Sequence, residues 1–192
     1  MPTSDPAVMA FLLSRRSCAA LSLGAPVPER AALDPILTAA ALCPDHGKLE
    51  PWRFIVLESA ALDRLADLAE TRAVALNVMP EKAAKLVTTF RRASLVVAVI
   101  SAPKPSDKIP VIEQIYSAGA ACLGLLNAAL ASGWGANWIT GWVAHDREFV
   151  RRGLGLAESE TVAGFIHIGT ASGVPPERPR PDMAAITSWV AQ

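Results

Sequence analysis

The chain has 192 residues, of which 52% are hydrophobic and 19% charged, and its 18 basic residues balance its 18 acidic residues. The apolar excess excludes a globally disordered chain, and a net charge of zero argues against nucleic-acid binding, which normally needs a basic surplus. Three scattered cysteines (Cys18, Cys43 and Cys122) without CxxC spacing predict neither a disulfide framework nor a zinc site. We expect one cytoplasmic domain over residues 1–192, without a metal ion.

In the first half of the chain, apolar periodicity and prolines predict four helices and a strand. Ser4 or Asp5 caps the first helix, which ends near Arg15-Arg16. The next elements are helix 28–42, strand 52–58, helix 60–76 with Ser59 as its cap, and helix 80–92. Pro35 lies inside the second helix, where it should cause a kink or shift the start, because proline removes a backbone donor.

In the second half, strands alternate with helices. The β-branched run 95–100 predicts a buried strand, and three prolines place 102–110 in an exposed loop. We then expect helix 111–132 stopped by Gly133, an extended segment 138–143, a short helix from its cap Asp146 to Arg152, and strand 162–168. After the proline-rich segment 173–181, residues 186–190 predict a final short strand.

The long helix 111–132 contains one charged residue, Glu113, and is therefore apolar on nearly every side. Its most apolar part, 115–131, is shorter than a comfortable membrane span and includes Tyr116, Ser117 and Asn127, so we expect a buried helix and no membrane. The N-terminus has no basic segment before an apolar run, so a secretory signal is not expected. A helix this apolar must be covered on all sides, and a partner subunit is the natural cover.

Three segments contain residues suited to ligand binding, although each has an ordinary alternative. Arg15-Arg16-Ser17 can bind a phosphate or simply be a solvated helix end. The loop 44–52, which contains His46, can form a rigid binding wall or a turn with Trp52 in the core. The segment 133–141, together with Gly169-Thr170, offers glycines and flat tryptophan faces, or is a bulged core strand.

Standard catalytic and nucleotide motifs do not occur in the sequence. There is no HExxH, GxSxG or GxxxxGK[ST], and no GxGxxG follows a strand. The pair Gly119 and Gly124 lies within the long helix and lacks a following lysine, so it does not predict a phosphate loop. Metal hydrolysis and an ordinary dinucleotide-binding fold are therefore disfavoured.

Taken together in this order, the segments resemble the FMN-dependent nitroreductase family, and most closely its compact bacterial NAD(P)H nitroreductase branch. The motifs are an RRS near residue 15, PDHxxxxPW at 44–52, a small-residue helix ending in GxGxxW at 133–138, and a strand ending in Gly169-Thr170. The resemblance covers nearly the whole chain. It implies an α+β fold with a central, mostly antiparallel sheet flanked by helices, and a C-terminal strand exchanged with the partner subunit of a homodimer.

The resemblance also implies the site. FMN would lie at the subunit interface, with its phosphate and ribityl chain near Arg15, Arg16 and Ser17, and His46 of the other subunit against the flavin. Contacts near the ring or phosphate are implied for Trp138, Ile139 and Thr140, and late phosphate contacts for Arg178 and Arg180. The segment 128–133 matches a stretch linked to the nicotinamide cofactor.

The sequence departs from the family pattern at four positions that bear on the flavin. Leu42 and Ile139 stand where close relatives often have arginine, Ala19 where larger members have a basic residue, and Glu50 where glutamine is usual. Leu42 remains a candidate flavin contact. Because a cation near the flavin pyrimidine stabilises its reduced anion, these changes are expected to affect the reduction potential.

The implied function is a ping-pong transfer of two electrons from NAD(P)H through flavin N5 to nitroaromatic or quinone acceptors, with no obligatory catalytic side chain. The alternative is a flavin-binding storage or sensor protein without turnover. A dehalogenating or flavin-fragmenting enzyme is a third possibility, for which 76–85 is the one candidate lid. Cys18 and Cys43 could be redox thiols, but buried packing is favoured.

Overall fold

The computed structural model describes residues 3–191. Its helices and strands, with three short 3₁₀ helices (η), are α1 (Pro6–Ser14), η1 (Ala20–Ser22), β1 (Leu23–Gly24), α2 (Arg30–Ala40), η2 (His46–Lys48), β2 (Trp52–Glu58), α3 (Ser59–Ala75), α4 (Pro80–Arg92), β3 (Leu95–Ser101), α5 (Val111–Ala131), β4 (Gly135–Ile139), η3 (Trp142–His145), α6 (Arg147–Leu154), β5 (Thr161–Ala171) and α7 (Met183–Ile186).

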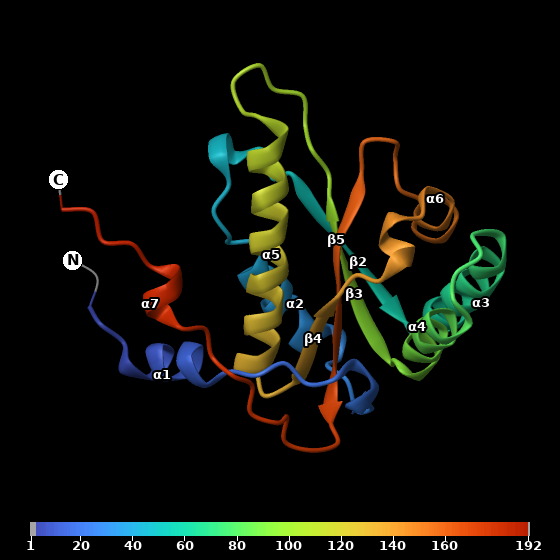
Figure 1. The fold of residues 1–192 in the computed structure, drawn as a ribbon, viewed down its shortest axis with the longest axis horizontal. Helices are drawn as coiled ribbons and strands as arrows, with labels where there is room; N and C mark the ends of the chain where they lie inside the picture. Colours follow the sequence, from blue (N-terminus) through green and yellow to red (C-terminus); the bar gives the residue numbers. More distant parts are fainter. Residues whose placement is uncertain (1–2, 192) are drawn as a thin grey trace.

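The five strands form one antiparallel sheet, in which β5 is the central member. The order is β1-β5-β3-β2, and β4 also pairs with β5. Helices cover both faces: α2 and α5 lie on one side, and α3, α4 and α6 on the other (Figure 1). The expected α+β class with a helix-flanked antiparallel sheet is confirmed.

Strand β3 shows how the sequence builds both cores at once. All seven of its residues are buried, as its uninterrupted apolar run predicts. Because side chains alternate across a strand, Val96, Ala98 and Ile100 pack with α3 and α4, whereas Leu95, Val97 and Val99 pack with α2 and α5. The sheet is therefore held by two apolar layers, and the candidate site residues lie at its margins.

Helix α5 has the length and apolar composition to cross a membrane, but its contacts identify it as a core helix. Eight of its residues are buried, and it packs on α2 and on β3, β4 and β5. Its opposite face is exposed, including Ile112, Ile115, Tyr116 and Leu123. Within one chain, therefore, the sheet and α2 cover one side of this helix, and its other apolar side stays exposed.

Several predicted boundaries and one predicted cap are wrong. Strand β4 starts at Gly135 rather than 138, and 142–145 is a 3₁₀ helix rather than extended. Helix α3 begins at Ser59, so Ser59 is not its cap. Asp146 is the N-cap residue of α6, as predicted, and its carboxylate accepts two hydrogen bonds from Arg72, at 2.6 and 3.0 Å, which lower the pKa of Asp146.

The C-terminal segment also differs from the prediction. Instead of a strand at 186–190, the chain forms the short helix α7, because the Asp182 side chain accepts the backbone N–H of Ala184. Residues 187–191 then continue without regular structure. Figure 1 shows this tail on the same side of the molecule as α1, away from the sheet.

Candidate functional site

The two arginines that follow α1 are held by the local backbone. The chain leaves the helix at Arg15, whose Nη2 donates to Ser17 Oγ at 3.0 Å. Arg16 Nη1 donates to the carbonyl oxygens of Ser14 and Arg15 at 2.9 and 3.0 Å. The Nε atoms of both arginines are buried, and neither has a hydrogen-bond partner within residues 3–191. Buried donors without acceptors are costly, so this corner suits an external anion.

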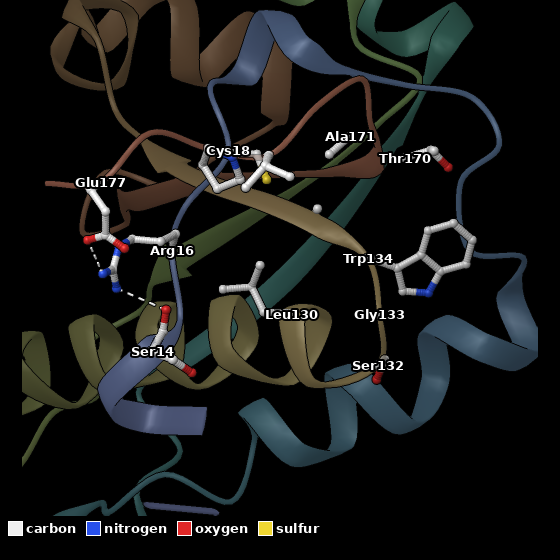
Figure 2. A pocket seen from close by; sticks show the side chains of 13 residues that line it. Ser14, Arg16, Cys18, Leu130, Ser132, Gly133, Trp134, Thr170, Ala171 and Glu177 are labelled. Atoms are coloured by element: carbon white, nitrogen blue, oxygen red, sulfur yellow. Dashed lines mark hydrogen bonds and ion pairs between the residues drawn. The ribbon is translucent and has the colours of Figure 1, made fainter. Parts of the chain in front are cut away.

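A cleft of about 690 Å³ opens beside Arg16. Its walls come from distant parts of the chain: the end of α1, the end of α5, the start of β4, the end of β5 and the proline-rich tail. Figure 2 shows Arg16 between Ser14 and Glu177, with Leu130, Trp134 and Thr170 around the opening. The structure thus brings Arg16 together with the start of the predicted segment 133–141 and with Thr170.

Close backbone contacts form the floor of this cleft. A side chain at Gly135 would approach Leu23 Cδ2 at 2.6 Å and the Gly169 carbonyl at 3.1 Å, so glycine lets the strands meet there. Gly133, with φ of 84°, makes the turn from α5 into β4. The arginine segment is joined to β4, because Cys18 N–H donates to Ala136 and the Asn137 amide donates to the Cys18 carbonyl.

His46 lies on a second and smaller cleft of about 530 Å³, between the loop after α2 and the exposed side of α5. Its Nδ1 is 2.7 Å from Glu113 Oε2. Within one chain, His46 does not line the Arg16 cleft. A single chain cannot show a contact with the other subunit's flavin, so the role expected for His46 stays a prediction.

The predicted Trp138-Ile139-Thr140 segment ends β4, and its side chains alternate between the two faces of the sheet. Trp138 is partly exposed, and its indole N–H donates to the Ala163 carbonyl at 3.3 Å. Ile139 packs into the core formed with α3 and α4, so its side chain points away from Trp138. Thr140 follows the strand and is partly buried.

The remaining predicted contacts lie outside both clefts. Leu42 is exposed in the turn after α2. Arg180 donates to the Leu13 carbonyl at 2.8 Å, which attaches the tail to the end of α1, and Arg178 is exposed. The tail residues that line the Arg16 cleft are instead Val174, Pro175 and Glu177, of which Glu177 is charged and pairs with Arg16.

The thiols fit packing rather than redox chemistry. All three cysteines are free, and burial raises the pKa of Cys122 to about 12. Burial also raises the pKa of Cys43, whose Sγ lies 3.6 Å from the Ser117 carbonyl oxygen. Since the thiolate is the reactive form, both groups are poor nucleophiles at neutral pH.

Four residues at these sites were not identified from the sequence: Glu113, Ser117, Asn137 and Glu177. A signal existed for two of them, because Glu113 is the one charge in an apolar helix and Ser117 lies one turn later on the same side. Asn137 lies in the candidate segment 133–141 and Glu177 in the proline-rich segment 173–181, but neither could be singled out, since their partners are 119 and 161 residues away in the sequence.

Comparisons with known proteins identify the family. The family model described as "Nitroreductase family" matches residues 12–170. A Haemophilus influenzae protein named "Putative NAD(P)H nitroreductase" is 37% identical over 164 residues, which is 84% of this chain and 87% of the relative. The Escherichia coli K12 protein named "Putative NAD(P)H nitroreductase YdjA" is 32% identical over 160 residues, 83% of this chain and 86% of the relative.

Solved structures share the fold. A nitroreductase-like family protein from Bacillus cereus superimposes with a TM-score of 0.81 at 20% identity, covering 100% of both chains. A Desulfovibrio desulfuricans protein described as a "putative nitroreductase in complex with fmn" has a TM-score of 0.73 at 21% identity, covering 96% of both chains. The family match covers most of the chain, both named relatives exceed 30% identity, and the fold agrees, so the chain belongs to the nitroreductase family.

Proposed function

We propose that this chain is an FMN-dependent NAD(P)H oxidoreductase that acts as a homodimer. The observation that carries the proposal is Arg16 at the edge of an open cleft, next in the chain to Arg15, with the buried Nε atoms of both arginines unpartnered within residues 3–191. A phosphate supplies strong acceptors for such donors, and arginine pairs with phosphate through charge-assisted bonds. The names of the two bacterial relatives support the same donor and reaction class.

The residues present fit FMN. Arg15, Arg16 and Ser17 would hold the phosphate and ribityl chain, and the open space at Gly133 would let the ligand approach the backbone. When bound, FMN would accept a hydride from NAD(P)H and pass two electrons, in ping-pong order, to a nitroaromatic or quinone. The segment 128–133, at the end of α5, would contribute to the nicotinamide site.

The protein's own part is binding, orientation and electrostatics. Trp138 would present the exposed part of its indole to the flavin, and Thr140 would add a polar contact. Isoleucine at position 139 is uncharged and packs against the α3–α4 core, so positive charge near the flavin would rest on Arg15 and Arg16. Leu42, Arg178 and Arg180 would complete the site only in the dimer.

The dimer is supported by apolar surface that one chain leaves uncovered. Helix α1 has no buried residue, although it contains Val8, Met9, Leu12 and Leu13. The outer side of α5 and the tail residues Trp189 and Val190 are also exposed. Large apolar patches of this kind mark interfaces. The tail would pair with the partner's sheet, and His46 of the partner subunit would reach the flavin.

The test is an absorbance spectrum of the purified protein before and after addition of NADPH. A flavin spectrum that bleaches with NADPH, and release of FMN rather than FAD on denaturation, are expected. Protein that is colourless and does not bind added FMN contradicts the proposal. Steady-state NADPH oxidation with a quinone separates an enzyme from the alternative, a flavin storage or sensor protein, which would bind FMN without turnover.

A further inference from the structure

The imidazole of His46 and the carboxylate of Glu113 form a close pair. Nδ1 of His46 lies 2.7 Å from Oε2 of Glu113, and both side chains are partly exposed at the smaller cleft. His46 belongs to the loop after α2, and Glu113 to the first turn of α5. This pair therefore connects a loop to the helix that is left uncovered in the single chain.

The backbone on which His46 sits is anchored to the same side of α5. Ser117, four residues after Glu113, donates its hydroxyl to the Pro44 carbonyl at 2.7 Å and accepts the Trp52 indole N–H at 3.1 Å. Residues four apart on a helix are neighbours on one face. One face of α5 thus fixes both the backbone before His46 and the ring itself.

The loop has its own constraints, which limit the positions open to the ring. The Asp45 carboxylate accepts the backbone N–H of Glu50 at 2.6 Å. Gly47, Lys48 and Glu50 all have positive φ, which makes the loop a specific turn rather than a flexible link. Asp45 and Tyr116 also line this cleft, but the carboxylate of Asp45 is used within the loop, and Glu113 is the acid that contacts the ring.

We propose that Glu113 is a positioning residue that holds His46 with its proton on Nδ1. An ionised carboxylate only accepts hydrogen bonds, so in the neutral ring this contact selects the Nδ1–H form and leaves Nε2 as a hydrogen-bond acceptor. The group that Nε2 meets is then an N–H donor. Resting on the proposed function, this donor is the imide N–H of the flavin or the carboxamide of the nicotinamide.

The first experiment measures the tautomer directly. Nitrogen-15 NMR of the histidine rings at pH 8 is feasible because the chain has three histidines, and His46→Asn identifies the His46 signals. The Nδ1–H form is expected in the unsubstituted protein and in Glu113→Gln, whose amide oxygen still accepts. Glu113→Ala should lose this preference. Glu148→Ala, which removes an exposed carboxylate from α6, is the matched control and should change nothing.

The second experiment identifies the donor. FMN is titrated into apoprotein, and NADP⁺, which has the same carboxamide but cannot reduce the flavin, into flavin-loaded protein, with flavin absorbance as the readout. Loss of one neutral hydrogen bond should weaken one of these two affinities about 2- to 10-fold in Glu113→Ala, and Glu113→Gln should restore it. Weaker FMN binding assigns the flavin imide, and weaker NADP⁺ binding assigns the carboxamide.

Three results would overturn the proposal: an unchanged tautomer in Glu113→Ala, unchanged affinities for both ligands, or Glu113→Gln behaving like Glu113→Ala. The first two remove the link from Glu113 to His46 or from His46 to a ligand, and the third shows that charge rather than the acceptor matters. Failure of the unsubstituted protein to bind FMN would instead reject the proposed function, and the NMR measurement would still decide the His46–Glu113 relationship.

Discussion

The guanidinium of Arg16 forms an ion pair with the carboxylate of Glu177, which lies 161 residues later in the chain. Arg16 is largely buried, whereas the Glu177 side chain is 83% exposed. The tail therefore places an acid on the arginine that we propose for the flavin phosphate (Figure 2). The two anions cannot share this guanidinium without repelling each other.

Replacing Glu177 by glutamine should strengthen FMN binding. An exposed ion pair is worth about 0.2–1 kcal/mol, so removing the competing charge should lower the dissociation constant about 1.5- to 5-fold. Quenching of FMN fluorescence on binding is the measurement. Glu158→Gln, at a carboxylate that is 95% exposed and away from the cleft, is the control. Weaker binding in Glu177→Gln would show that Glu177 orients Arg16 rather than competing for it.

Arg15→Ala should weaken FMN binding. A charge-assisted hydrogen bond contributes about 1.5–3 kcal/mol, which corresponds to a loss of roughly 10- to 150-fold in affinity. The same titration measures it, with Arg151→Ala as a control, because Arg151 pairs only with Glu148 on the exposed side of α6. An unchanged dissociation constant would identify Arg15 as a helix end and leave the phosphate to Arg16 or to the tail arginines Arg178 and Arg180.

The parts of the fold that local chemistry determines could be predicted from the sequence. Strand β2 and helix α4 have the predicted bounds, because an alternating β-rich run and the Pro80 start are local signals. Strand β4 was displaced by three residues because its limits come from pairing with β5, where Gly135 faces Gly169. No local pattern contains a register between strands so far apart in the sequence.

His167 makes stability sensitive to acid. Its ring is buried beside Phe90, neither nitrogen has a hydrogen-bond partner within residues 3–191, and burial lowers its pKa to about 4. An unfolded histidine titrates near 6.5, so the unfolded state binds more protons between these values. The free energy of unfolding is therefore unaffected by protonation of His167 above about pH 6.5. It falls as the pH drops from there to about 4, by about 3 kcal/mol in total.

Replacing His167 by phenylalanine should remove this part of the acid sensitivity. Urea unfolding at pH 7.5 and pH 5 gives the comparison: the unsubstituted protein should lose about 2 kcal/mol more between these values than His167→Phe does. His145→Gln, at an exposed histidine, should behave as the unsubstituted protein. Equal acid sensitivity in His167→Phe would mean that other groups control it.

The Trp138 indole packs directly against the backbone of Gly164. A side chain at this position would collide with Trp138 Nε1 and approach Cys122 Sγ at 3.1 Å. Gly164→Ala should therefore displace the indole from the Ala163 carbonyl, shift the tryptophan fluorescence and destabilise the protein by about 1–3 kcal/mol. Gly24→Ala, another strand glycine with open space around it, is the control. Unchanged fluorescence would show that the strand relaxes instead.

The parts of the candidate site that lie within one short segment of the sequence could be predicted. Arg15-Arg16-Ser17 and Gly133 were found because adjacent cations and a helix stop are visible in the sequence. The side-chain direction at Ile139 was not, because it depends on which face of β4 meets the α3–α4 core. The His46–Glu113 pair joins residues 67 apart, which local patterns do not reveal.

The final prediction concerns the dimer. Leu123, at the centre of the exposed side of α5, should lie in the subunit interface, and an arginine there would be buried without a partner. Leu123→Arg should therefore convert a dimer into a monomer of 20.2 kDa in light scattering at low micromolar concentration. Val74→Arg, at an exposed apolar residue near the end of α3, should remain dimeric.

Truncation after Pro181 tests the tail in the same way. It removes Trp189 and Val190, which are almost fully exposed in the single chain and which we expect to cover the partner. If His46 of the partner subunit contacts the flavin, FMN binds to the dimer but not to the monomer, and its binding stabilises the dimer by mass action. Both Leu123→Arg and the truncated chain should then lose dimer and FMN together. A monomer that retains FMN would contradict the shared site, because one chain would then supply every flavin contact.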